Sequence, residues 1–220
     1  MNIDISHQLK EKIGIVKLGI LSFSSTVSSN NSELWELITA EMEKVKSNFK
    51  IEDVNKQENI ASARNAYKKS GKDPNRYRPA ADSLLRRIIK GLGLYKVNNV
   101  VDVLNYISIT SGFSIGGYDL DKIEGNIIFD IGTSSDIYEG IGRGVLNVEG
   151  LPILRDTKGP FGCPTSDSLR TMINENTNNI VFIFFDFGLN KDLSNTLSET
   201  QLMLEKYTDS KNFNIQNIEL

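Results

Sequence analysis

The sequence predicts an α+β fold, with helices concentrated in the first half and short strands and turns in the second. Three observations support this. The apolar positions between 32 and 49 recur at helical spacing. After Gly112 the chain changes to short β-branched segments separated by turn residues. The strand expected at 180–187 begins with the continuous apolar run Ile180–Phe185, which is typical of a strand buried on both faces in the middle of a sheet.

The helices are predicted from apolar periodicity and from residues that start or stop helices. Ser32 can cap the first, Pro79 fits a first helical turn, and Asn99 with Asp102 resembles a capping box. Gly112 can end the helix that Asn98 and Asn99 open. The helices are expected at about 32–49, 57–70, 79–90, 98–112 and 193–207. The strands are expected at 13–23, 127–131, 145–148, 151–154 and 180–187.

The composition limits the possible classes of protein. The longest apolar run, Ile180–Phe185, is too short to span a bilayer, and the first residues do not form a signal peptide. The single cysteine, Cys163, excludes an intramolecular disulfide and agrees with a reducing cytoplasm. The single histidine, His7, makes a zinc site or a histidine-based catalytic triad unusual. We therefore expect a cytoplasmic protein with no metal or cofactor.

Positive charge is concentrated in one segment of an otherwise acidic chain. Residues 64–96 contain ten Lys and Arg against two Asp, while the net charge of the whole chain is −3. Such a segment could bind a polyanion, or it could be a solvated helix face with internal ion pairs, and the sequence does not decide between them. The residues that we expect to contact RNA are Arg76, Arg78, Arg86, Arg87 and Lys90.

A resemblance to a known family rests on residues 97–123. The segment Val97-Asn98-Asn99-Val100-Val101-Asp102 continues to Asn105-Tyr106, and it is followed by Gly112 and by Tyr118-Asp119-Leu120-Asp121-Lys122-Ile123. These letters and their spacing resemble the B3/B4 domain of the phenylalanyl-tRNA synthetase beta chain. The upstream block from Tyr77-Arg78-Pro79 to Lys90-Gly91 resembles the form found in stand-alone B3/B4 proteins. The resemblance implies a layered fold of mixed sheets covered by helices, as a single domain over 1–220. Its core would span about 76–187, with the strand-helix region 1–75 and a C-terminal helix at 190–208 completing it.

The same polar residues also have a structural explanation. Asn98 or Asn99 can accept hydrogen bonds from first-turn N–H groups, and Asp102 complements the helix dipole. Asn105 would need a partner at a half-buried position, such as the backbone of the following loop. Framework roles are therefore favoured over catalytic roles for the asparagines and for Asp102.

In the synthetase this domain hydrolyses tyrosine wrongly attached to the tRNA, so the resemblance implies an editing pocket. Two family residues of that pocket are replaced here. The family carries a histidine where this chain has Gly116, and a glutamate in the late strand, where this chain has no acid before Asp186. Without a placed polar partner, a pocket should not select tyrosine by its hydroxyl.

A loop rich in turn residues and hydroxyls could supply polar groups to the pocket in place of the histidine and the glutamate. Residues 159–168 contain two prolines, two glycines and several hydroxyls, and they lead to Arg170. Their N–H groups could hold a carboxylate or phosphate, or they could form a capped turn with a structural arginine. Cys163 has no histidine partner and is expected to be a packed thiol. The expected pocket residues are Asn98, Asn99, Ser114, Gly116, Tyr118, Gly162, Thr165, Ser166, Asp167, Ser168 and Arg170.

Three functions fit these observations. The first is a tRNA-binding domain that hydrolyses misacylated tRNA in trans, a hydrolase acting on an ester rather than a complete aminoacyl-tRNA ligase. The second is a non-catalytic module that binds tRNA or an amino-acid-like ligand, and the third is a protein-interaction domain. No catalytic residue, DNA sequence recognition, membrane contact or oligomeric state is predicted.

Overall fold

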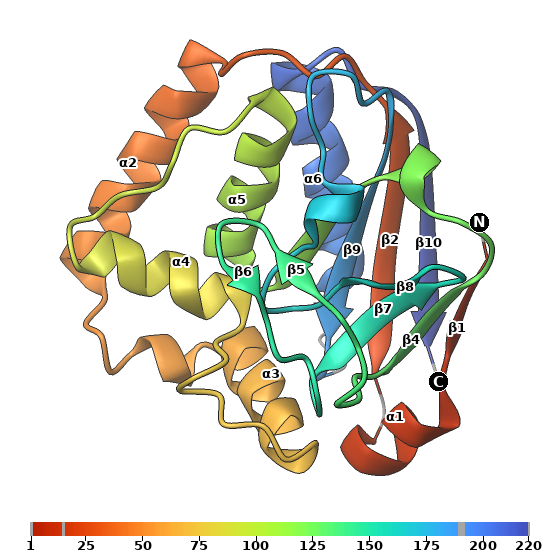
Figure 1. Cartoon of the computed structure of the whole chain (residues 1–220). Coiled ribbons are helices and arrows are strands. Elements are labelled where there is room, and N and C mark those ends of the chain that lie inside the picture. The colour runs from red at the N-terminus through yellow and green to blue at the C-terminus, as the bar shows by residue number, and fades with distance from the viewer. Residues whose placement is uncertain (1, 15, 189–191, 220) are drawn as a thin grey trace.

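The computed structural model describes residues 2–14, 16–188 and 192–219. Six α-helices lie in these ranges: α1 (His7–Ile13), α2 (Ser32–Asn48), α3 (Glu58–Lys69), α4 (Ala80–Ile89), α5 (Asn99–Ser111) and α6 (Leu193–Tyr207). Three short 3₁₀ turns accompany them: η1 (Val54–Lys56), η2 (Leu120–Lys122) and η3 (Leu169–Thr171). Helices α2–α5 gather on one side of the molecule and the sheets on the other (Figure 1). This is the predicted α+β class.

The strands form two four-stranded sheets and a small hairpin. The first sheet has the order β10 (Lys211–Glu219), β2 (Lys17–Ser24), β9 (Asn179–Asp186), β3 (Ser114–Asp119), with every pair antiparallel. The second has the order β1 (Ile3–Ile5), β4 (Ile127–Ile131), β7 (Pro152–Asp156), β8 (Gly159–Gly162), and its β1–β4 pair is parallel. The hairpin joins β5 (Glu139–Gly140) to β6 (Gly144–Val145).

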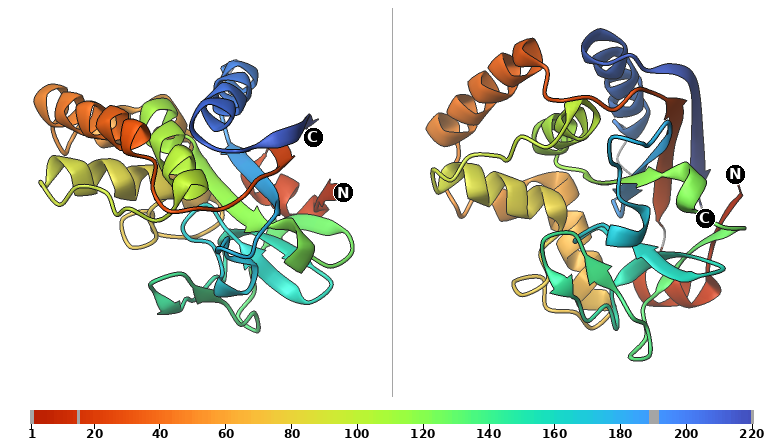
Figure 2. Two further views of the ribbon diagram at one scale, coloured as in Figure 1. Left: turned by 90° about the horizontal axis from the view of Figure 1, so that it is seen from above. Right: turned by 45° about the horizontal axis from the view of Figure 1, so that its top comes forward.

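The first sheet lies between the helices and the second sheet. Alternate residues of β9 explain this: Phe182 and Phe184 pack in the cluster that includes α2, α5 and α6. Val181, Ile183 and Phe185 face the opposite way and pack against α1 and the strands of the second sheet. A strand buried on both faces must be apolar throughout, so the predicted central strand is confirmed. Figure 2 shows the same arrangement of helices and sheets from two further directions.

Several sequence predictions need correction. Ile13, predicted as the first residue of a strand, ends helix α1, and the strand begins at Lys17. Of the predicted strand 145–148 only Val145 is extended in a ladder. Helix α2 is capped by Asn31, whose side chain accepts a hydrogen bond from Leu34 N at 3.1 Å, rather than by Ser32. The helix expected at 190–208 is observed at Leu193–Tyr207, and residues 190 and 191 lie outside the described residues.

Candidate functional site

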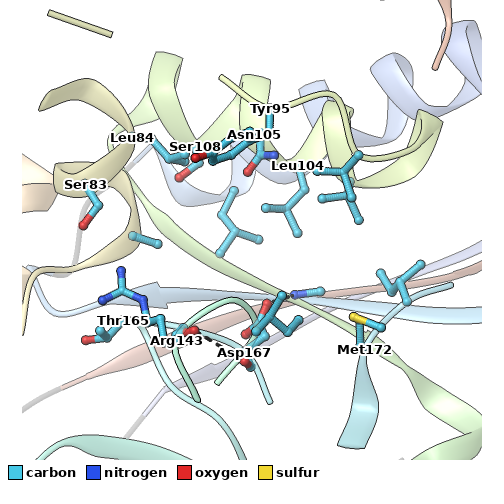
Figure 3. A pocket seen from close by; sticks show the side chains of 18 residues that line it. Ser83, Leu84, Tyr95, Leu104, Asn105, Ser108, Arg143, Thr165, Asp167 and Met172 are labelled. Carbon is cyan, nitrogen blue, oxygen red and sulfur yellow. Dashed lines mark hydrogen bonds between the residues drawn. The ribbon is translucent and has the colours of Figure 1, made fainter. Parts of the chain in front are cut away.

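A cavity of about 380 Å³ opens between helices α4 and α5 and the loop that follows β8. Figure 3 shows its two walls: one carries Ser83, Leu84, Leu104, Asn105 and Ser108 from the helices, and the other carries Arg143, Thr165, Asp167 and Met172. The helical wall combines the aliphatic side chains of Leu84 and Leu104 with the polar side chains of Ser83, Asn105 and Ser108. The charged groups, Arg143 and Asp167, both lie on the loop side, as in sites that bind an apolar group and orient a polar one.

The polar wall is held rigidly by the backbone around it. The Ser168 N–H donates to Phe161 O at 3.0 Å, and the Ile141 N–H donates to the carbonyl of Asp167 at 2.9 Å. The Tyr138 hydroxyl donates to Ser166 O at 2.5 Å. The loop thus lies between β8 and the β5–β6 hairpin, which fixes the direction of the Asp167 side chain.

Asp167 is a poorly solvated carboxylate at this wall. Its Oδ2 accepts a hydrogen bond from Gly117 N at 3.1 Å, while its inaccessible Oδ1 has no hydrogen-bond partner among the described residues that meets normal geometry. Burial raises the pKa of Asp167 to about 7, against a smaller lowering by the nearby Tyr118 hydroxyl and the Gly117 N–H. A carboxyl group that titrates near neutral pH can accept a proton in a reaction at that pH.

The side chain of Tyr118 fills the space around two glycines. A Cβ added at Gly116 would lie 1.9 Å from the Tyr118 hydroxyl oxygen, and one added at Gly162 would lie 2.2 Å from it. The ring is fully buried, and burial together with the Asp167 charge raises the pKa of Tyr118. Residue 116 can therefore carry no side chain while Tyr118 holds this position. The close approach of the Tyr118 hydroxyl is a physical reason for a glycine at position 116.

The hydroxyls of the loop differ in their availability. Thr165 shares a 2.8 Å hydrogen bond with the Tyr67 hydroxyl, so its Oγ1 is engaged below the cavity wall. Ser166 makes only a 3.4 Å contact to the carbonyl of Asp167. Ser166 is therefore the hydroxyl that is freer to contact a ligand.

Most cavity residues were not predicted as site residues, and two of them, Arg143 and Asn105, carry polar groups that are free to contact a ligand. Arg143, interpreted from sequence as part of a turn, lines the cavity, and its guanidinium makes no ion pair or hydrogen bond within the described part of the chain. Asn105 was expected to bond the following loop, but its amide lines the cavity without a partner among the described residues. The glycines around Arg143 indicate a turn and give no sign of a binding role. That Asn105 lacks a hydrogen-bond partner among the described residues follows only from the positions of its neighbours in the fold.

Most of the other predicted pocket residues support the fold and do not line the cavity. Asn98 caps α5 through Val101 N at 2.8 Å, and Asn99 binds Ser28 N at 2.9 Å. Ser114 accepts a long contact from Ala81 N at 3.4 Å. Ser168 caps η3, and Arg170 forms a two-pronged ion pair with Asp156 at 2.8 and 3.1 Å. Of the predicted set, Thr165, Ser166 and Asp167 line the cavity.

The basic segment separates into internal and exposed cations. Arg64 and Arg86 both pair with Asp82, which is fully buried. Arg87 lies over the ring of Tyr95, 3.9 Å from its centroid. Arg76, Arg78 and Lys90 are exposed. The segment thus contains both internal ion pairs and a solvated positive surface.

The remaining reactive side chains lie in ordinary environments. Cys163 is buried, which raises the pKa of its thiol to about 11. His7 is exposed on α1 and lies 3.6 Å from Glu11. No group of three or more His, Cys, Asp or Glu that could hold a metal ion occurs among the described residues. In the same ranges no helix is long and apolar enough to cross a membrane.

Comparison with known proteins identifies the family. The B3/4 domain profile matches residues 62–207, about two thirds of the chain. The chain belongs to the B3/4 domain family. This B3/4 protein is 25% identical over 138 residues to the phenylalanine–tRNA ligase beta subunit of Fusobacterium nucleatum, covering 61% of the chain and 17% of that relative. It is 42% identical over 52 residues to the same subunit of Rickettsia prowazekii, covering 24% of the chain and 6% of the relative.

A solved structure is also similar. It is an N-terminal fragment of the phenylalanyl-tRNA synthetase beta subunit from Pyrococcus horikoshii, with a TM-score of 0.49 and 13% identity. The similarity covers 99% of this chain and 53% of that one. The B3/4 protein thus matches only a small part of the curated ligase subunits, and about half of the fragment.

Proposed function

We propose that the cavity binds the aminoacyl end of a charged tRNA and that the protein hydrolyses the ester bond, with Asp167 as the general base. The observation that carries this is a cavity of about 380 Å³ with an apolar wall and one underbonded carboxylate. The volume fits a ligand of amino-acid size. The similarity to ligase beta subunits supports charged tRNA as the source of the ester.

The chemistry follows from the arrangement of the two walls. An apolar amino-acid side chain would contact Leu84, Val101 and Leu104, which leaves the ester near the polar wall. Asp167 would take a proton from water as the water oxygen attacks the carbonyl carbon. The bond to the ribose oxygen then breaks and that oxygen takes up the proton, giving a free amino acid and uncharged tRNA. Arg143, whose charge is unpaired, would stabilise the negative carbonyl oxygen that forms during attack.

Selectivity for tyrosine is not part of this proposal. Gly116 pairs with Ile183 across the β3–β9 ladder, and neither of these two residues carries a polar side chain. The aliphatic side chains of the helical wall, Leu84, Val101 and Leu104, favour leucine-like or phenylalanine-like substrates, although Ser83, Asn105 and Ser108 lie on the same wall.

For a tRNA substrate, we expect the protein to be cytoplasmic and to bind the tRNA backbone through a positively charged surface. The exposed cations Arg76, Arg78 and Lys90 would contact the tRNA backbone. Arg86 is the weakest candidate of the predicted set, because its guanidinium is already held by Asp82 and Asn55.

The test is deacylation of a panel of aminoacyl-tRNAs by the protein and by Asp167→Asn. We expect release from tRNAs that carry apolar amino acids and a loss of about 100-fold or more in the rate for Asp167→Asn. Asp209→Asn, an exposed carboxylate outside the cavity lining, is the control and should retain the rate. If the protein releases no amino acid from any tRNA in the panel, the hydrolase proposal fails.

A non-hydrolytic role is the second candidate, and one observation favours it. Asp167 and the unpaired Arg143 lie on the same wall, so they could hold the ammonium and carboxylate groups of a free amino acid. Calorimetric titration with free apolar amino acids separates the two roles. Binding that is lost in both Asp167→Asn and Arg143→Ala, without ester hydrolysis, would establish the binding module instead.

A further inference from the structure

The segment between α4 and α5 presents large apolar side chains to solvent at the mouth of the cavity. Leu92, Tyr95 and Val97 are 60%, 69% and 53% exposed. Tyr95 and Val97 also line the cavity. A tyrosine ring this exposed gains little from folding, because the apolar area remains in water. Its placement at the mouth therefore calls for a ligand that covers it.

The ring of Tyr95 is held in place from below. The Arg87 guanidinium carbon lies 3.9 Å from the ring centroid, and Arg87 Nη2 reaches Leu92 O at 3.4 Å. Further along the segment, the Val97 N–H donates to Asp102 Oδ1 at 3.0 Å, which fixes the chain to α5. One face of the ring is thus covered by a cation, and most of the exposed area belongs to its edges and its other face.

The charges around the mouth favour an anionic partner. Arg87 and Arg143 form no ion pair with any described residue; Arg87 lies against the Tyr95 ring, and Arg143 lines the cavity. A free planar face with unpaired cations near it is the combination that binds a nucleobase and its phosphates, since every base has a π-face that can stack. A protein partner would more often cover the patch with apolar side chains and would not need the unpaired cations.

We propose that Tyr95 is the stacking platform for an unpaired nucleobase at the mouth of the cavity, with Arg87 behind the ring. This rests on the proposed function in one respect: it places the terminal base of an aminoacylated RNA beside the cavity that takes the amino acid. The ribose ester would then reach from the mouth toward Asp167. Base stacking, rather than hydrogen bonding to base edges, makes this contact tolerant of base identity.

The experiment uses an RNA trinucleotide that carries no amino acid, so it does not depend on hydrolysis. The probe is cytidine-cytidine-2-aminopurine, whose fluorescence falls when the base stacks, and the comparison RNA has an abasic 3′ residue and is followed by calorimetry. We expect the native protein to bind the base-containing RNA about tenfold more tightly than the abasic one. Tyr95→Ala should remove this difference, and Tyr95→Phe should retain it.

Two controls make the outcome decisive. Ile137→Ala changes another exposed apolar residue, 85% exposed and outside the cavity lining, and should have no effect. Circular dichroism establishes that Tyr95→Ala is folded. Equal affinities of the native protein for the two RNAs overturn the proposal, and so does an unchanged difference in Tyr95→Ala. In either case Tyr95 is not a stacking platform for a nucleobase. If the protein hydrolyses aminoacyl-tRNA but does not stack the base, the proposed function stands and the stacking proposal fails. If it stacks the base but hydrolyses no ester, the stacking proposal stands and the proposed function fails.

Discussion

Two buried regions of the protein carry an aspartate, and they differ in how well the carboxylate is satisfied. Asp102, on α5, is 1% exposed and accepts from Trp35 Nε1 at 2.6 Å, Asn30 Nδ2 at 2.8 Å and Val97 N at 3.0 Å. Asp167, on the cavity wall, accepts from Gly117 N alone among the described residues at normal geometry. The sequence predicts a framework role for Asp102 and a place in the pocket for Asp167, and their surroundings differ accordingly.

The difference indicates what each carboxylate is for. A buried carboxylate with three donors joins the helix α2 region, the segment before α5 and α5 itself, and its removal leaves those donors unpaired. A carboxylate that lacks donors is costly to keep charged and is retained where a proton or a ligand can exchange with it. The comparison predicts that substitutions at Asp102 affect stability and substitutions at Asp167 affect function.

The largest effect on stability is expected at Asp102. Asp102→Ala should lower the free energy of unfolding by about 3 kcal/mol, because three donors lose their acceptor in the interior. Asp102→Asn, which keeps one acceptor oxygen, should lose about half of that. Urea unfolding followed by circular dichroism measures both. Equal stability of Asp102→Ala and the native protein would contradict the framework role.

A smaller effect is expected where Tyr118 fills the space next to Gly116. Gly116→Ala should cost about 2 kcal/mol, because the new Cβ overlaps the tyrosine hydroxyl and the core is already full. In a Tyr118→Leu background the same change should cost less, since the overlapping atoms are gone. A double-mutant cycle of unfolding free energies measures this coupling. Additive costs would show that the two positions do not compete for space.

The pH dependence of stability should report Asp167. Its carboxyl binds a proton up to about pH 7 in the folded state but only up to the ordinary value of 3.8 in the unfolded state. Between these values the folded state holds more protons, so stability falls as the pH rises. Asp167→Asn should remove this fall, about 4 kcal/mol between pH 4 and pH 8. Unfolding curves across that range test it, and identical pH profiles of the two proteins would refute the raised pKa.

The smallest effect is expected on the positive surface. Arg78→Ala should weaken binding of uncharged tRNA a few-fold and lower the salt dependence by about one unit of slope, because one phosphate contact is lost. Arg86→Ala should instead lower stability, since it removes a partner of buried Asp82. Filter binding at several salt concentrations, with urea unfolding of each variant, separates the two. A salt slope unchanged by Arg78→Ala would make this surface only a solvated face.

Much of the fold followed from local patterns. The apolar run of β9, the glycine that ends α5 and the periodicity of α6 are local signals, and each element was placed correctly or nearly so. Strand β10 was not predicted, because its residues are polar and its extended form depends on pairing with β2. Strand β3 was missed because its glycines weaken the strand signal, although close packing requires both: Gly116 approaches Tyr118, and Gly117 approaches Leu104.

The site was predicted only in part, for a similar reason. The turn-rich loop indicated Thr165, Ser166 and Asp167, which line the cavity. It could not show that Arg170 is neutralised by Asp156, or that Asp167 lacks donors, because both facts depend on residues distant in the sequence. A general base was not expected from sequence, since an aspartate in a polar loop has no visible sign of a raised pKa.

The most direct test of the account is the pH–rate profile of single-turnover deacylation between pH 5 and pH 9. With Asp167 as the base, the logarithm of the rate should rise with a slope of one and level off near pH 7, where the carboxyl loses its proton. Asp102→Asn should keep this shape, and Asp167→Asn should give a low rate without the inflection. A profile that keeps its inflection near pH 7 in Asp167→Asn would contradict the central claim.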